Sequence, residues 1–279
     1  NHYTTTVNNY LGAATYKIIK GESTGDTEYF KSDFASDEER AAYEDALCAQ
    51  VEAEGAALLK NDNAALPLAS GAKVSLFGHG SVDLMYGGTG SGSVDTSKAP
   101  SFKQALESQG ITVNETLWNL YSSDDMMKNY SRVTPAAISD TLEANTQYAV
   151  NEAPWSKLSG AESSFAEYGD AAIVVLSRSG GEGADLPSGE NGTNDSWVSG
   201  QEGDGNYLAL SAEEKELLAN LKTLKDNGTF KKIVVLINSS NAIELDFLNP
   251  ELCGEDYGID SAMWIGDVGQ TGINGVAQL

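Results

Sequence analysis

The chain has 279 residues, 41% of them hydrophobic, so it can bury a substantial core in one large or two modest domains. Its 41 acidic and 17 basic residues give a formal net charge of −24, which repels nucleic-acid phosphates and anionic lipid head groups and argues against nucleic acid as a partner. A neutral ligand such as a sugar is compatible with this charge.

Targeting and redox signals are sparse. No run of about 18 apolar residues predicts a membrane-spanning helix, and residues 1–4 lack the basic and apolar regions of a signal peptide. Cys48 and Cys253 are far apart and stand in no C-x-x-C pair. The cysteines leave the compartment open, and we expect a bacterial extracellular or cell-surface protein rather than a cytoplasmic one.

Residues 1–35 show little periodicity and are expected to form an extended N-terminal arm. The segment 36–39 has the capping-box pattern, in which a serine and a glutamate satisfy free N–H groups at a helix start. The helix that follows carries an apolar stripe at near-helical spacing, which predicts that it packs on a sheet and ends over 61–67. The stripe consists of Tyr43, Leu47, Val51 and Leu58.

A βαβ unit is predicted next. Residues 73–77 read as a strand that runs into a glycine-rich loop over 78–93. A short helix over 100–109 and a strand over 111–113 complete the unit. Residues 115–165 are expected to be mostly helical and loop-like, with a helix start at Thr134-Pro135.

The pattern then repeats. Residues 171–176 form an unbroken apolar run, typical of a parallel strand covered on both faces. A second capping box at 211–214 opens a leucine-striped helix that closes near Gly228. Strands over 232–237 and 261–265 follow. This alternation predicts an α/β fold for residues 36–279: a three-layer sandwich whose largely parallel sheet is flanked by helices.

The last residues, after the loop at 269–272, have the pattern of a helix that has only begun at Leu279. We therefore expect the sandwich domain to be truncated at its C-terminal end. The sequence would then be one piece of a longer polypeptide, or one chain of a cleaved or split protein.

One carboxylate stands between glycines at the end of the strand 171–176. The segment 177–185 reads SRSGGEGAD, and its glutamate is Glu182. Ligands of open α/β sheets bind where the parallel strands end, and glycines let a ligand and the backbone approach closely. On local sequence alone, a solvated turn explains this glutamate better than catalysis does.

Several other chemistries fit the sequence poorly. The segment 78–83 begins like a dinucleotide fingerprint but has Asp83 in place of the third glycine, and 88–93 lacks the lysine of a P-loop. With only His2 and His79 no metal site stands out, and the acidic stretch 190–204 lacks regular calcium-loop spacing. A serine nucleophile is disfavoured, because His79 would be its only credible base. We expect no cofactor and no metal.

Carboxylate chemistry remains. A retaining glycosidase needs an acid that protonates the leaving oxygen and a second carboxylate about 5–5.5 Å away that attacks the anomeric carbon. Glu182 could supply the acid, but the chain offers no equally well-placed second carboxylate.

Four motifs in order resemble the α/β sandwich domain of family-3 glycoside hydrolases, the β-glucosidase family. They are residues 51–68, the glycine loop with Gly80-Ser81 and 87–91, the S-G-G-E-G-A-D loop at 179–185, and G-x-x-G-Q-x-G at 266–272. The likeness runs from about residue 40 to the end. Its arm, with NYLG at 9–12, is similar to the subgroup in which the sandwich precedes the barrel.

This resemblance implies a role for Glu182 as general acid/base, and an aspartate nucleophile on a (β/α)8 barrel domain that is absent from this chain. The barrel could belong to the same polypeptide or to a second chain. The implied activity is that of a retaining exo-β-glycosidase, a β-glucosidase above all, acting on non-reducing terminal β-linked sugars; the chain alone would be inactive. Leu186 replaces the usual arginine and the insertion 187–203 is long, so the sugar and linkage stay open.

Three further residues are candidates for contact with a small carbohydrate substrate. Thr89 and Ser91 could hydrogen-bond sugar hydroxyls, although turn capping is an equally good interpretation. Trp197 could form a stacking platform, whereas packing is favoured for Trp155 and Trp264. The alternative function is a non-catalytic carbohydrate-binding or structural α/β module. A nucleotide-binding α/β protein is the third possibility.

Overall fold

The computed structural model describes residues 32–88, 90–133, 149–180 and 207–279. The chain divides into two compact units, residues 1–44 and 45–279. Most of the arm predicted over 1–35, and the helix start predicted at Thr134-Pro135, lie outside the described residues.

A six-stranded sheet with the order β1-β6-β5-β4-β2-β3 forms the centre of the second unit. Strands β2 to β6 pair in parallel, and β1 joins β6 antiparallel at one edge. The strands are β1 (Ala57–Asn61), β2 (Lys73–Phe77), β3 (Thr112–Val113), β4 (Ala171–Ser177), β5 (Ile233–Asn238) and β6 (Ser261–Trp264). The predicted largely parallel sheet is confirmed.

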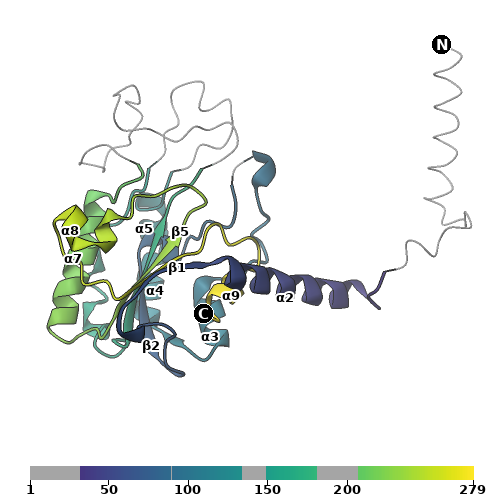
Figure 1. Ribbon diagram of the computed structural model, residues 1–279, viewed down its shortest axis with the longest axis horizontal. Coiled ribbons are helices and arrows are strands. Elements are labelled where there is room, and N and C mark those ends of the chain that lie inside the picture. Colours follow the sequence, from purple (N-terminus) through teal and green to yellow (C-terminus); the bar gives the residue numbers. More distant parts are fainter. Residues whose placement is uncertain (1–31, 89, 134–148, 181–206) are drawn as a thin grey trace, which may run out of the picture. The chain divides into compact units, whose positions relative to one another are not determined.

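Helices cover both faces of this sheet (Figure 1). One face packs with α4 (Glu115–Tyr121), α5 (Asp124–Asn129) and α7 (Ala212–Asp226), and the other with α3 (Phe102–Ser108) and α9 (Ile273–Val276). Successive β4 residues alternate between the two cores, with Val174 in one and Val175 in the other. Because every β4 residue is buried, its sequence reads as an unbroken apolar run, and the three-layer sandwich is confirmed.

The capping signals have different outcomes. At α7 the box is complete: Ser211 Oγ accepts from Glu214 N, and the Glu214 carboxylate accepts from Ser211 N. At α2 (Asp37–Gly55) it is half formed, since Ser36 Oγ accepts from Glu39 N while the Glu39 carboxylate accepts from Ala35 N.

The prediction that the apolar stripe of α2 packs on the sheet is wrong. Leu47 and Val51 are 45% and 63% exposed, Tyr43 is exposed as well, and the helix ends at Gly55, so Leu58 belongs to the edge strand β1. The helix face that packs instead carries the small residues Ala49 and Ala53 beside the half-buried Glu52. Ala49 is buried, and its carbonyl oxygen lies directly against Gly275 of α9. Small side chains let the two backbones approach more closely than a leucine stripe would.

Among the described residues, one more short α-helix, α8 (Pro250–Cys253), follows β5 and has Gly254 at its C-cap. Across the described residues, none of the helices combines the length and the apolarity needed to cross a bilayer.

Candidate functional site

The parallel strands β2, β4, β5 and β6 end at the same edge of the sheet, and polar residues are buried where they end. The loops that leave this edge start at 78, 178, 239 and 265. Among the buried polar side chains of the described residues, many belong to these loops or to segments that pack against them. They are His79, Ser81, Glu152, Ser177, Arg178, Ser179, Glu214, Asn238 and Ser239.

Arg178, the first residue after β4, is fully buried and fully paired. Its guanidinium donates to both carboxylate oxygens of Glu214, at 2.8 and 2.7 Å. The remaining N–H groups donate to the carbonyls of Tyr207, Ala209 and Ser177 at 2.7–3.0 Å. Burial opposes the charge of Arg178, but the Glu214 carboxylate outweighs it and raises the pKa of the guanidinium.

These bonds tie together the two ends of the long loop that contains Glu182. Arg178 precedes the loop, while Tyr207 and Ala209 follow it. The Tyr207 hydroxyl adds a second tie, because it accepts from Ser179 N at 2.9 Å and donates to Ser179 O at 3.1 Å. We call the set Arg178, Ser179, Tyr207 and Glu214 the loop clamp.

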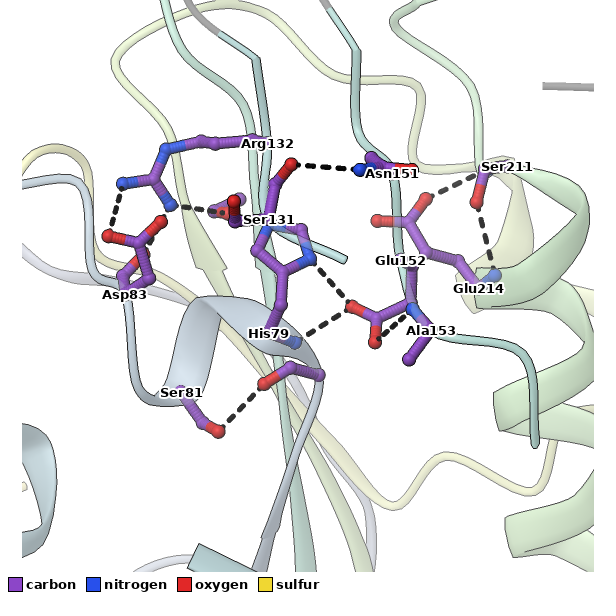
Figure 2. Close-up of polar contacts among 12 residues, drawn as sticks. His79, Ser81, Asp83, Ser131, Arg132, Asn151, Glu152, Ala153, Ser211 and Glu214 are labelled. Atoms are coloured by element: carbon purple, nitrogen blue, oxygen red, sulfur yellow. Dashed lines mark hydrogen bonds and ion pairs between the residues drawn. The ribbon is translucent and has the colours of Figure 1, made fainter. Parts of the chain in front are cut away.

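His79, after β2, connects the strand ends sideways. Its Nδ1 and its backbone N–H both bond the Glu152 carboxylate, at 2.9 and 2.8 Å, and Figure 2 shows the two side chains facing each other. Its Nε2 lies 3.4 Å from Ser177 Oγ. The order is that of a serine–histidine–acid triad, but all three residues are at most 4% exposed. No substrate reaches Ser177 Oγ, so this chain of bonds is structural.

Arg132 closes the same edge beside Ser177. It forms an ion pair with the Asp83 carboxylate at 3.2 Å, visible in Figure 2, and donates to the Asp83 and Leu84 carbonyls. One of its nitrogens also lies 3.3 Å from Ser177 Oγ. Arg132 therefore holds the loop after β2 against the end of β4.

Asn238 performs the same task at the end of β5. Its amide bonds both the N–H and the carbonyl of Met85, at 2.6 and 3.0 Å, and also donates to the Gly266 carbonyl at 2.7 Å. One fully buried side chain thus joins the loops that follow β2, β5 and β6.

Two glycines allow the close contacts at this edge. Gly78 has φ +83°, and a Cβ there would lie 2.7 Å from the Val175 carbonyl oxygen. A Cβ on Gly180 would lie 2.4 Å from Asn241 Oδ1. At Gly180 the close neighbour is a side chain from the loop after β5, and the approach of a ligand to the glycines of the 177–185 segment stays a prediction.

Two half-buried carboxylates lie where β6 ends. Burial, with a smaller contribution from the charge of Asp267, raises the pKa of Glu52 to about 7. Burial also raises the pKa of Asp267, although hydrogen bonds from the hydroxyl and backbone N–H of Ser240 oppose this. Both groups belong to the second unit.

The structure describes only some of the site residues predicted from the sequence. Glu182, Thr89 and Trp197 lie outside the described residues, so their roles stay predictions. Ser91 is exposed in the short 3₁₀ turn Gly90–Gly92. Packing is confirmed for Trp155, whose ring lies 6.4 Å from Phe77 and 6.2 Å from Phe165 between centroids.

Trp264 is a more exposed residue than the packing interpretation implies. Its Nε1 donates to the Ser239 carbonyl at 2.7 Å, which fixes the ring, yet the residue is 36% exposed. It is paired with Ala57 of β1 at the edge of the sheet.

Sequence reasoning missed the loop clamp and the Asn238 contacts. A signal existed for Arg178, because a charged residue directly after a fully apolar strand must find a partner if it is buried. Its partner, Glu214, already had an explanation as a capping residue. In the described parts of the chain, no three His, Cys, Asp or Glu side chains gather as a metal site.

Comparison with known families identifies the domain. The model of the glycosyl hydrolase family 3 C-terminal domain matches residues 56–279. The chain belongs to this family. The resemblance of the four motifs is thereby confirmed at the level of the family, and the sandwich is a family-3 C-terminal α/β domain.

Curated relatives of this family-3 domain are β-glucosidases. The chain is 29% identical over 232 residues to "Beta-glucosidase" of Ruminococcus albus, covering 83% of this chain and 21% of the relative. It is 27% identical over 202 residues to "Beta-glucosidase A" of Butyrivibrio fibrisolvens, covering 70% and 21%. The chain therefore spans about a fifth of the length of these relatives.

Solved structures show the same family-3 fold. A β-glucosidase from Paenibacillus barengoltzii has 25% identity and a TM-score of 0.59 over 83% of this chain and 22% of its own. The structure of β-glucosidase 3B from Thermotoga neapolitana has 24% identity and a TM-score of 0.59, over 86% and 29%. In each of these solved β-glucosidases, the part similar to this chain makes up less than a third of the protein.

Proposed function

We propose that this chain is the acid/base-bearing domain of a retaining exo-β-glycosidase of the β-glucosidase type. In this proposal it hydrolyses non-reducing terminal β-linked sugars together with a (β/α)8 barrel domain that supplies the aspartate nucleophile. The observation that carries the proposal is the position of the Glu182 loop within a family-3 domain: it leaves the carboxyl end of β4, and the buried loop clamp fixes both its ends.

The clamp suits an acid/base loop because proton transfer needs a carboxyl group at a fixed place. General acid catalysis requires the acid within about 3 Å of the oxygen that it protonates. Two hydrogen bonds from the Arg178 guanidinium, to the carbonyls of Tyr207 and Ala209, join the ends of the loop. The ion pair with Glu214 anchors the guanidinium to α7, so the loop starts and ends at defined points. Rigid ends restrict where Glu182 can reach.

Four of the described carboxylates at this edge are already engaged, and burial raises the pKa of a fifth, Glu52, which disfavours its ionised form. Both points support a nucleophile from elsewhere. Asp83 pairs with Arg132, Glu152 with His79, and Glu214 with Arg178. Asp267 accepts hydrogen bonds from Ser240. A nucleophilic carboxylate must be ionised and face the anomeric carbon, and each of these oxygens already has a neighbour that it would have to leave.

The central test is Glu182→Ala in the complete enzyme. Turnover of a substrate with a poor leaving group should fall by about 10²–10⁴-fold, since general acid catalysis contributes that much. Azide should partly restore turnover of a substrate with a good leaving group, by replacing the general base and attacking the glycosyl-enzyme. Unchanged turnover in the variant would refute the assignment.

The matched control is Glu190→Ala, a glutamate of the insertion 187–203 that follows the S-G-G-E-G-A-D motif. It should turn over both classes of substrate at the wild-type rate. The purified 279-residue chain should hydrolyse neither class, and measurable hydrolysis by it would contradict the need for a barrel.

A further inference from the structure

A shallow groove lies at the sheet edge, beside the loop that follows β5. Its volume is about 300 Å³, at the lower end of the range typical of small-molecule sites. Six of its lining residues come from three segments: Ala57 and Leu59 of β1, Asn241, Ile243 and Leu245 of the loop after β5, and Trp264 of β6. None of the described residues that line it is charged.

The indole of Trp264 is the rigid part of this groove. Its N–H is occupied by the Ser239 carbonyl, so the ring cannot turn without losing that bond. The residue is 36% exposed, and the other residues that line the groove are aliphatic apart from Ser240 and Asn241. A fixed, partly exposed aromatic face without charged neighbours is suited to packing against the C–H face of a neutral ring such as a sugar.

Asn241 connects the groove with the Glu182 loop. Its amide lies against Gly180, where a Cβ would come within 2.4 Å of Oδ1 and 2.5 Å of Nδ2. Its Nδ2 is buried and has no hydrogen-bond partner among the described residues. A buried donor without a partner is costly, so a partner is expected at this point, between the groove and the loop. Glu182 follows Gly180 by two residues, and two residues of chain span at most about 7 Å.

We propose that the Trp264 groove is the binding site for the leaving-group sugar of a β-linked disaccharide or oligosaccharide. The proposal rests on the proposed function. A glycosidase acid gives its proton to the glycosidic oxygen of the leaving group, so the leaving group must lie beside the loop that carries the acid. The groove meets this requirement through Asn241 and Gly180, and its uncharged lining selects a neutral sugar over a charged group.

The test compares two substrates in the complete enzyme. In a β-linked glucose disaccharide the leaving group is a sugar. In β-glucosyl fluoride the leaving group is a fluoride ion, which occupies no sugar site and departs without protonation. Trp264→Ala should lower kcat/KM for the disaccharide about tenfold, or ~1.4 kcal/mol, mainly through KM. The variant should leave kcat/KM for the fluoride unchanged. Trp264→Phe keeps an aromatic face and should restore most of the loss.

Two further variants guard against a folding artefact. Leu245→Arg places a charge at an exposed position of the groove and should reproduce the disaccharide-specific loss without disturbing the Trp264 ring. Leu252→Ala alters an exposed leucine, 71% accessible, that does not line the groove, and should change neither substrate. Melting temperatures of all variants are measured in parallel.

The outcomes separate this inference from the function on which it rests. If the wild-type enzyme hydrolyses neither substrate, the proposed glycosidase function fails. If Trp264→Ala lowers both substrates equally, the tryptophan is structural or the barrel covers the groove, and the sugar site is refuted while the function stands. If Trp264→Ala and Leu245→Arg both leave the disaccharide unchanged, the groove does not bind it.

Discussion

The two ends of the parallel sheet are built differently. Where the strands begin, the charged groups form partly exposed pairs: Lys231 with Asp170 before β5 and β4, and Lys225 with Asp260 before β6. Where the strands end, the polar groups are buried and joined in the loop clamp and around His79 and Asn238. Exposed pairs contribute little and tolerate movement, whereas buried networks fix positions at a high cost of disruption. The difference locates the end of the sheet that positions a loop.

Among the variants that test this contrast, Arg178→Met should have the largest effect. It leaves the Glu214 carboxylate buried without its cation, so the free energy of unfolding should fall by about 3–5 kcal/mol. Urea denaturation of the chain measures this. Activity of the complete enzyme should fall as well, because the loop ends lose their tie.

Arg178→Lys is the matched control for the clamp. It keeps a cation but loses the fork that bonds both carboxylate oxygens, so its stability should lie between wild type and the methionine variant. A double variant with Glu214→Leu should be more stable than Arg178→Met alone, because no unpaired charge remains. If Arg178→Met cost less than about 1 kcal/mol, the value expected of an exposed pair, the contrast between the two ends would collapse.

The sequence predicts the apolar skeleton better than the polar network. The runs at 171–176 and 232–237 predict buried strands because burial on both faces leaves no polar positions. The stripe through Leu58 misleads because the residue continues the helical spacing, although the helix ends at Gly55 and β1 begins two residues later. The pairing of Arg178 with Glu214 depends on how a loop closes over 36 residues, which local spacing does not encode.

The contacts of the candidate site were also hidden from the sequence, because they join residues from different strand ends. The four family motifs identify the loop of Glu182, and the family match confirms the domain. The motifs give no information on Asn241, which reaches Gly180 from another strand end, or on the exposure of Trp264. Contacts between strand ends come from the sheet order, and so they become visible only once the strands are placed.

Asn238→Ala is the second test and should have a smaller effect. It removes three hydrogen bonds and leaves the backbone groups of Met85 and Gly266 without that partner, which should cost about 2–3 kcal/mol of unfolding free energy. Urea denaturation again measures the loss. Asn129→Ala, at an exposed position, should change stability by no more than about 0.5 kcal/mol. Equal effects of the two changes would contradict the role assigned to Asn238.

Glu52→Gln tests the carboxylates beside β6 through pH. The folded chain binds the Glu52 proton more tightly than the unfolded chain, because its pKa rises from 4.5 to about 7. The stability gained from that proton is full below pH 4.5 and is lost as the pH rises through about 7. At pH 8 the glutamine variant should therefore exceed wild type by about 1 kcal/mol, after a discount for partial exposure.

Melting temperatures at pH 5 and pH 8 measure this difference. The wild-type chain should lose stability relative to Glu52→Gln between the two pH values. Glu54→Gln, an exposed neighbour on the same helix, should run parallel to wild type. A constant difference between wild type and Glu52→Gln across the range would show that Glu52 is not protonated in the folded chain at the lower pH.

Lys231→Ala, at the beginning of the strands, should have the smallest effect. In the wild type, the hydrogen bond from Lys231 lowers the pKa of the Asp170 carboxyl group most, and the hydrogen bond from the backbone N–H of Lys73 lowers it further. The pair would thus add stability above the unfolded pKa of Asp170 and lose it as the pH falls, but the lysine side chain is 73% exposed and solvent screens it. Urea denaturation at pH 7 should show a change between about 0 and 1 kcal/mol, which 0.5 M salt reduces further. A loss comparable to that of Arg178→Met would mean that both ends of the sheet hold their charges equally firmly, and the assignment of the positioning end would then rest on the family motifs alone.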